Sequence, residues 1–145
     1  MNNFTINFFN EDITLRIRDK NNLRQWISEV VQSEGQEMSN VNFIFCSDKY
    51  LHELNVNYLE HDNHTDVITF DLTDEEDVVS GDIFISYERI RENAKKFGVK
   101  ITNELHRVMI HGILHLIGYQ DDTKEKRAQM REFEDNHLAT RSWIS

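Results

Sequence analysis

Two histidines and an aspartate toward the C-terminus have the spacing of metal ligands. They form the pattern H-x-x-x-H-x-x-G-x-x-D, supplied by His111, His115, Gly118 and Asp121. Residues four apart on a helix lie on one face, so His111 and His115 can point at the same atom. Gly118 can adopt the left-handed conformation that often ends a helix, and the chain beyond it can bring Asp121 to that atom. The pattern predicts an open tripod of ligands around a divalent metal ion.

Three protein ligands and an open position are typical of catalytic zinc sites. Zinc at such a site lowers the pKa of bound water to about 7 and polarises a phosphoryl or carbonyl oxygen. We therefore expect one divalent metal ion per chain, with Zn2+ as the first choice. The alternative is a pair of hydrogen-bonded core histidines, but Gly118 and Asp121 at this spacing favour the metal. Non-haem iron also uses two histidines and one carboxylate.

The residue after the first histidine bears on the type of reaction. Metallopeptidases with the motif H-E-x-x-H place a glutamate there as the general base. This chain has Gly112 at that position. The glycine disfavours peptide hydrolysis and leaves the general base unassigned.

The same segment resembles the motif H-G-x-L-H-L-x-G-Y-D-H of the YbeY family. Seven residues are in register, namely His111, Gly112, Leu114, His115, Leu116, Gly118 and Tyr119. Residues 65–70, TDVITF, resemble the family stretch T-D-V-L-S-F, and residues 81–83 and 54–58 also fit the family. Three motifs in the family order, at 65–70, 81–83 and 111–121, make the resemblance specific over residues 50–121. With the order of helices and strands, we expect it to cover the whole chain.

YbeY proteins are bacterial metal-dependent endoribonucleases specific for single-stranded RNA, and they act in ribosomal RNA maturation and ribosome quality control. The resemblance implies a hydrolase of RNA phosphodiester bonds whose partner is single-stranded RNA, ribosomal RNA or the ribosome. It implies neither DNA nor a membrane as a partner. Two alternatives stay open, a metallopeptidase-like hydrolase and a ribosome-associated factor with a structural metal. The second alternative would need a fourth protein ligand close to the tripod.

The chain departs from the family pattern at two positions. The Asp-His pair that ends the family motif is Gln120 and Asp121 here, so the third ligand would be a carboxylate rather than an imidazole. Zinc accepts a carboxylate, but the added negative charge should make the bound water less acidic. Asp122 is the competing third ligand, and the family register favours Asp121. The family also has an arginine, thought to help activity, where this chain has Leu59.

Four further residues are weaker candidates for the site. Asp66 and Asp82 lie in matched motifs and could orient a ligating imidazole, or could be ordinary turn and strand-end aspartates. Thr65 could donate a hydrogen bond to the substrate. Arg107, one turn before His111, could replace the missing arginine, although an exposed surface arginine is the simpler interpretation. The other histidines match no ligand pattern and are interpreted as surface or interface residues, namely His52, His61, His64, His106 and His137.

The hydrophobic pattern predicts the scaffold that must position these residues. Strands are expected at 4–9, 41–46, 67–70 and 82–86. Helices are expected at 23–31, 51–58, 87–97, from 102 or 103 to 117, and at 123–138. Asp19 or Asn21 would cap the first helix and Asp48 the second. The last turns of the helix at 102–117 are apolar on nearly all sides, so we expect it to be buried. The order predicts an α+β fold in which residues 1–145 form a single domain, with a small mixed β-sheet of about four strands covered by about five helices. The metal motif would then lie on a buried helix and the turn after it.

Length and charge limit the remaining possibilities. A chain of 145 residues favours one domain, and its one cysteine, Cys46, excludes an intramolecular disulfide and is expected to be buried. The net charge of −10 argues against nonspecific binding of nucleic acid. Residues 89–107 are locally basic, so with strand 82–86 they could line an RNA groove beside the metal, or form a solvated helix face. We see no secretory signal and no apolar stretch long enough for a membrane span, so a cytoplasmic location is expected.

Overall fold

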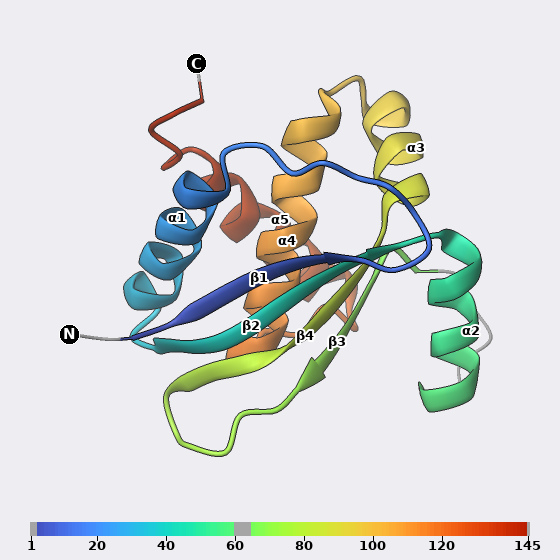
Figure 1. The fold of residues 1–145 in the computed structure, drawn as a ribbon. Coiled ribbons are helices and arrows are strands. Elements are labelled where there is room, and N and C mark those ends of the chain that lie inside the picture. Colours follow the sequence, from blue (N-terminus) through green and yellow to red (C-terminus); the bar gives the residue numbers. More distant parts are fainter. Residues whose placement is uncertain (1–2, 60–64, 145) are drawn as a thin grey trace.

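The computed structural model describes residues 3–59 and 65–144 and arranges them as a four-stranded sheet packed with helices (Figure 1). The elements are, in order, β1 (Thr5–Asn10), α1 (Lys20–Ser33), β2 (Glu37–Cys46), α2 (Asp48–Leu59), β3 (Val67–Asp71), β4 (Val78–Ser86), α3 (Tyr87–Phe97), α4 (Ile101–Ile117) and α5 (Lys124–Leu138). The strands β1, β2 and β4 are adjacent and parallel, and β3 completes the sheet as an antiparallel edge beside β4. The predicted α+β fold with a small mixed sheet and five helices is confirmed within these residues.

The two faces of the sheet have different partners. Ile83 and Ile85 of β4 belong to the main core, which α1 and α4 close from behind the sheet in the view of Figure 1. Phe84 contacts a smaller cluster on the opposite face, where its ring stacks with Tyr50 of α2 at a centroid distance of 6.4 Å. Because successive side chains of a strand point to opposite faces, Asp82 shares the face of Phe84 and not the face that carries α4.

Helix α4 is the central helix of the main core. Gly112 lies against β4, and a Cβ at this position would come 2.7 Å from Cγ2 of Ile83. Only a glycine allows the helix to approach the sheet this closely. The close approach fixes the rotation of α4, and with it the direction in which the neighbouring His111 points.

Two strands are longer than the hydrophobic pattern predicted. Strand β2 begins at Glu37 rather than 41, strand β4 begins at Val78 rather than 82, and these two first residues pair with each other. The register of this ladder shifts between Met38 and Val41. The extra residues are partly polar and pair through the backbone, so a pattern of apolar side chains could not reveal them.

The two predicted helix caps had different outcomes. Asp19 occupies the N-cap position of α1, although its side chain makes no capping hydrogen bond. In α2 the hydroxyl of Ser47 accepts a hydrogen bond from the backbone N–H of Tyr50 at 3.1 Å. Ser47 is therefore the capping residue of α2, and the prediction of Asp48 was wrong by one residue.

Cys46 is fully buried, as expected for a cysteine that packs as a small apolar residue. Burial, with a smaller contribution from the charges of Asp12, Glu11 and Asp48, raises the pKa of its thiol to about 12. In the described part of the chain, none of the helices has the length and apolar character needed to cross a bilayer.

Candidate metal centre

The C-terminal end of α4 brings the three predicted ligands together. Gly118 ends the helix with a φ of +123°, and its N–H donates to the carbonyl of Leu114 at 3.1 Å. The chain then turns back and brings Asp121 to the two histidines. His111, His115 and Asp121 each offer one ligand atom, and these atoms all lie within 4.8 Å of one another.

The three ligand atoms form a nearly equilateral triangle. Nε2 of His111 lies 3.0 Å from Nε2 of His115, and Oδ2 of Asp121 lies 3.2 and 3.4 Å from these two nitrogens. Bonds of about 2.0–2.1 Å to a tetrahedral zinc ion place its ligand atoms about 3.3–3.4 Å apart. The triangle is therefore close to the size that one zinc ion requires.

The hydrogen bonds behind the two imidazoles determine their tautomers. Nδ1 of His115 lies 3.1 Å from the carbonyl oxygen of Tyr119, which can only accept, so this nitrogen carries the proton. Nδ1 of His111 lies 2.5 Å from Oε2 of Glu134, a carboxylate that also accepts. In their neutral forms both rings thus turn an unprotonated Nε2 toward the other ring and toward Asp121. Three lone pairs that converge in this way repel one another unless a cation lies between them.

Glu134 of α5 is a site residue that the sequence pattern missed. Its side chain is only 2% exposed, and its other carboxylate oxygen, Oε1, accepts a hydrogen bond from Nη1 of Arg107 at 2.8 Å. Arg107 also donates to both carboxylate oxygens of Glu104, which is equally buried. The series Glu104, Arg107, Glu134 and His111 holds the ring of His111 in one orientation. A carboxylate behind a ligating histidine is the usual arrangement at metal sites.

This charge network also sets the pKa values at the site. Burial alone would lower the pKa of His111, but the hydrogen bond and charge of Glu134 outweigh it, and Asp66 and Asp121 add to the effect, so the pKa is raised. Burial alone would raise the pKa of Glu134, but its contacts with His111 and Arg107 outweigh that effect and lower it. Glu134 therefore stays ionised and remains an acceptor for His111.

The turn that carries Asp121 is attached to the end of α1. The hydroxyl of Tyr119 donates to Oε2 of Glu34 at 2.6 Å, and Nε2 of His137 lies 2.9 Å from Oε1 of the same glutamate. Asp122, the competing third ligand, points elsewhere, with a side chain that is 68% exposed and paired with a lysine. The geometry therefore places Asp121, and not Asp122, beside the histidines.

The weaker candidates are divided between the two faces of the sheet. Asp82 accepts a hydrogen bond from Asn42 at 3.0 Å on the face opposite α4. The prediction that Asp82 orients an imidazole is therefore wrong, because neighbouring residues of a strand point to opposite faces. Asp66 is near enough for its charge to affect the pKa of His111. Thr65 donates to the backbone carbonyl two residues ahead at 3.3 Å, and its role toward a substrate stays a prediction.

Arg107 and His106 are not the surface residues that we expected. The side chain of Arg107 is 14% exposed and is bound by two carboxylates, so it cannot replace the family arginine at the substrate. His106 is buried between Trp26 and Trp143 and accepts a hydrogen bond from Nη1 of Arg141 at 2.8 Å. Burial, and then the charge of Arg141, lowers the pKa of His106 to about 4. Both residues therefore stabilise the interior around α4 and are not part of an exposed surface.

Within the basic segment at 89–107, only Arg107 lies near the ligands, and the lysines of α3 do not. Lys95 and Lys96 occupy the last turn of α3, and Lys95 lines the same hollow as Ile101, the first residue of α4. The ligand His115 lies 14 residues further along α4, which corresponds to about 21 Å. The RNA groove predicted beside the metal is therefore not formed by these lysines. His61 and His64 lie outside the described residues, as does the side chain of Leu59.

Comparison with known proteins connects this geometry to a family. Residues 6–142 match the family described as Endoribonuclease YbeY. This chain belongs to the YbeY family. Endoribonuclease YbeY of Cytophaga hutchinsonii is 41% identical over 139 residues, which cover 96% of this chain and 97% of that protein. Endoribonuclease YbeY of Flavobacterium psychrophilum is 48% identical over 132 residues, which cover 90% and 92%. The solution structure of TM1509 from Thermotoga maritima is similar with a TM-score of 0.61 at 31% identity, covering 93% of this chain and 90% of that one.

The match to the YbeY family extends beyond the three motifs over nearly the whole chain, as the order of helices and strands led us to expect. Those motifs end at Asp121, whereas the match continues through α5 to residue 142. It therefore includes Glu134, the carboxylate behind His111, together with all three candidate ligands.

Proposed function

We propose that this member of the YbeY family is a metal-dependent endoribonuclease that cleaves single-stranded RNA, with one zinc ion held by His111, His115 and Asp121. Ribosomal RNA, free or within the ribosome, is the proposed substrate. One observation carries the proposal, the convergence of Nε2 of His111, Nε2 of His115 and Oδ2 of Asp121 at 3.0–3.4 Å. The relatives that support the choice of RNA are themselves named endoribonucleases.

Each residue of the cluster has a distinct part in this function. When bound, the metal ion would polarise a phosphoryl oxygen and make water more acidic. His111 and His115 present Nε2 because Glu134 and the carbonyl of Tyr119 bind the opposite nitrogen. The side chains of His111, His115 and Asp121 are 18%, 24% and 37% exposed, so a phosphodiester can reach the open side of the tripod.

The geometry disfavours the two alternative functions. A peptidase glutamate in place of Gly112 has no space, because that position packs against Ile83. Within residues 3–59 and 65–144, the ligand cluster has three members. Three ligands are typical of catalytic zinc, whereas structural zinc usually has four.

Metal content and RNA cleavage, measured on the same preparations, test the proposal. The wild type and Asp122→Ala should carry about one zinc ion per chain and cleave single-stranded RNA but not DNA of the same sequence. His115→Ala should lose both properties. Asp122→Ala is the matched control because it removes a neighbouring carboxylate that is paired with Lys126 at 3.1 Å. Stoichiometric zinc and full cleavage in His115→Ala would contradict the proposal.

A further inference from the structure

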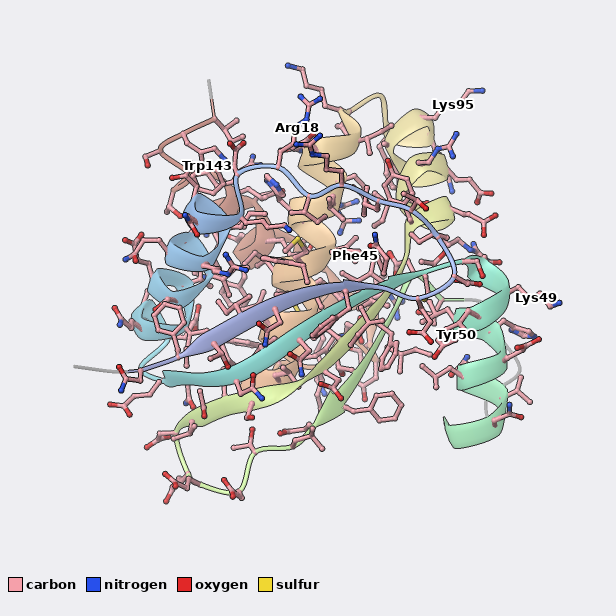
Figure 2. The ribbon with its side chains drawn as sticks, in the orientation of Figure 1. Arg18, Phe45, Lys49, Tyr50, Lys95 and Trp143 are labelled. Atoms are coloured by element: carbon pink, nitrogen blue, oxygen red, sulfur yellow. The ribbon has the colours of Figure 1, made fainter. Side chains whose placement is uncertain are left out.

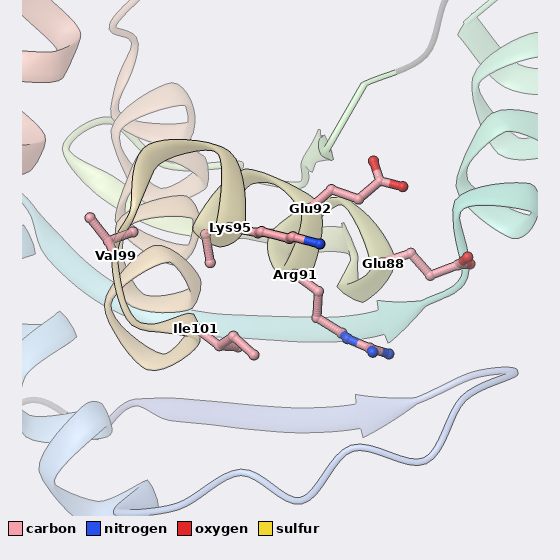
Figure 3. Close-up of a pocket in the computed structure, with 7 residues that line it drawn as sticks. Glu88, Arg91, Glu92, Lys95, Val99 and Ile101 are labelled. Atoms are coloured by element: carbon pink, nitrogen blue, oxygen red, sulfur yellow. The ribbon is translucent and has the colours of Figure 1, made fainter.

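Four neighbouring hollows run along the end of the molecule at which α4 begins. A hollow of about 520 Å³ lies between α3 and the start of α4 (Figure 3), and one of about 400 Å³ lies under the connection from β1 to α1. Both are lined by Ile101. Two further hollows, of about 490 and 220 Å³, share Arg16 and Ile17 with the second. Neighbouring hollows share lining residues, and we call the four together the basic belt.

The belt is basic although the chain is acidic. Its linings include six basic side chains, Arg16, Arg18, Lys20, Arg24, Arg91 and Lys95. Only three acidic residues line it, Asp19, Glu88 and Glu92. The whole chain has 16 basic and 26 acidic residues, so the ratio of basic to acidic residues is inverted here. An inversion of this size concentrates positive charge at one end of the molecule.

Most of this charge is not neutralised by the protein itself. Arg16, Arg18, Lys20 and Lys95 are exposed, and no carboxylate of the described residues lies within 4.0 Å of their charged atoms. Arg18 and Lys95 project from the same end of the molecule (Figure 2). By contrast, the carboxylate of Glu88 accepts a hydrogen bond from a backbone N–H at the start of α2 and points away from Arg91 (Figure 3).

The opposite end of α4 carries several carboxylates. Oδ2 of Asp121 lies beside the two histidines and Oε2 of Glu134 lies behind His111. The nearby cations Arg107, Lys126 and Arg127 are already bound to oxygens of the protein. These carboxylates repel the phosphates of an RNA strand, so an RNA substrate needs favourable contacts elsewhere. Phosphate contacts with Lys and Arg supply most of the affinity of nonspecific nucleic-acid binding.

We propose that the basic belt binds the sugar-phosphate backbone of single-stranded RNA and anchors the strand that the metal centre cleaves. The inference rests on the proposed endoribonuclease function. The belt and His115 are separated by about 21 Å along α4. A stacked strand advances about 3.4 Å per nucleotide, so about six nucleotides span this distance. Strands longer than this can occupy both sites together, while shorter ones cannot.

The test compares two double variants with the same change of charge. Arg16→Glu with Lys95→Glu alters the belt, and Lys49→Glu with Lys124→Glu alters two exposed lysines outside it. Binding to the metal-loaded protein is measured by fluorescence anisotropy with single-stranded oligodeoxyuridylate, which has the same phosphates and is not expected to be cleaved. Cleavage of oligouridylate is followed in parallel.

The salt dependence of binding gives the expected magnitude. Each phosphate contact to a single strand contributes about 0.7 to the slope of log affinity against log salt. With six contacts the wild type should lose about 300-fold in affinity between roughly 50 and 200 mM salt, and with four contacts the belt variant should lose only about 50-fold. The control variant should behave as the wild type. In cleavage, the belt variant should raise KM for long strands and leave kcat unchanged.

Three outcomes separate the possible errors. Equal affinity and equal salt slope in the wild type and the belt variant would overturn the inference and leave the endoribonuclease function intact. Poly-L-aspartate and oligouridylate of equal charge are also compared as competitors of the bound oligonucleotide. If poly-L-aspartate displaces it at the lower concentration, the inference is overturned in favour of an acidic protein partner. If the wild type binds the oligonucleotide at the belt but does not cleave RNA, the proposed function is refuted and the belt remains a binding site for single strands.

Discussion

Replacing Glu134 by glutamine should weaken metal binding without touching a ligand. The amide of Glu134→Gln has nearly the shape of the carboxylate, so the packing of this buried side chain is preserved. Its oxygen can still accept from Nδ1 of His111, but the negative charge behind the ring is lost. Arg107 then keeps only Glu104 as a charged partner.

The expected size of the effect follows from the contact that changes. Glu134 Oε2 lies 2.5 Å from Nδ1 of His111, and its side chain is 2% exposed, so water screens this contact poorly. Glu134→Gln exchanges a hydrogen bond to a charged group, which contributes about 1.5–3 kcal/mol, for a neutral one, which contributes about 0.5–1.5 kcal/mol. The difference of about 1–1.5 kcal/mol corresponds to about 5- to 13-fold in affinity. Changes behind metal ligands generally cost about 10- to 100-fold in metal affinity. The two ranges meet near tenfold, so we expect a zinc affinity lower by about one order of magnitude.

Competition with a chromophoric chelator measures this zinc affinity directly. Glu132→Gln is the matched control, because Glu132 is an exposed glutamate on the same helix and makes the same change of charge. Glu134→Asp keeps the charge but retracts it by one methylene, so its affinity should lie between those of the wild type and Glu134→Gln. Thermal unfolding of the metal-free proteins shows whether each variant is folded before zinc is added. A folded Glu134→Gln with zinc affinity within a factor of about two of the wild type would refute the role of Glu134.

Three further predictions concern the ligand, a buried histidine and the contact between α4 and the sheet. Asp121→His should retain zinc, measured by metal analysis, and lower the pH midpoint of RNA cleavage, because a neutral ligand leaves more of the metal's charge on water; an unchanged midpoint would contradict this. His106 has a folded-state pKa of about 4, below the unfolded value of about 6.5, so its contribution to stability is full above pH 6.5 and is lost as the pH falls toward 4. Between pH 7 and 5, His106 should cost the wild type about 2 kcal/mol of its free energy of unfolding, and His106→Gln should lack this loss. Chemical unfolding at several pH values measures it, and parallel pH profiles for the two proteins would argue against a neutral buried His106. Gly112→Ala should destabilise the protein by about 1–3 kcal/mol through its clash with Ile83. Combined with Ile83→Ala, it should cost less than the sum of the two single losses, and additive losses would argue against the clash.

The ligand set could be predicted because it depends on local geometry. His111 and His115 are one helical turn apart, and Gly118 is where the helix must end, so their relative positions follow from backbone rules alone. Asp121 lies only three residues beyond that glycine, which leaves its carboxylate few places to go. The order of helices and strands was predictable for the same reason, since each element has its own short-range pattern.

The residues behind the ligands could not be predicted in this way, because their contacts join distant segments. Glu134 reaches His111 across 23 residues, and Glu34 meets Tyr119 across 85. One sequence signal for Glu134 was present and not used. It lies four residues from Met130 and four from Leu138, both buried, so it shares the apolar face of α5. A glutamate on that face needs a charged partner, because a buried unpaired charge is costly.

Asp82 shows the opposite error, in which a motif match suggested a role that the sheet forbids. Its neighbours in sequence match the YbeY family, but the pleat of β4 directs its side chain away from α4 and toward Asn42. A motif records which residues occur together, and it does not say which face each one occupies. The face that each residue of β4 occupies depends on how β4 pairs with β2. This pairing joins distant segments and includes the pair of Asn42 and Asp82.

The distribution of charge also explains why a metal ion should matter for RNA beyond the chemical step. Without a metal, the ligand end of α4 holds the carboxylates of Asp66, Asp121 and Glu134. The nearby guanidinium groups are already bound, that of Arg107 to Glu104 and Glu134 and that of Arg127 to the carbonyl of Asp121. A phosphodiester approaching this end meets carboxylates, and a divalent ion offsets most of their charge. Binding of RNA at the ligand end should therefore require the metal, whereas binding at the basic belt should not. Removing zinc should therefore abolish binding at the ligand end and leave binding at the basic belt unchanged. Long strands, which can occupy both sites together, should then lose part of their affinity when zinc is removed.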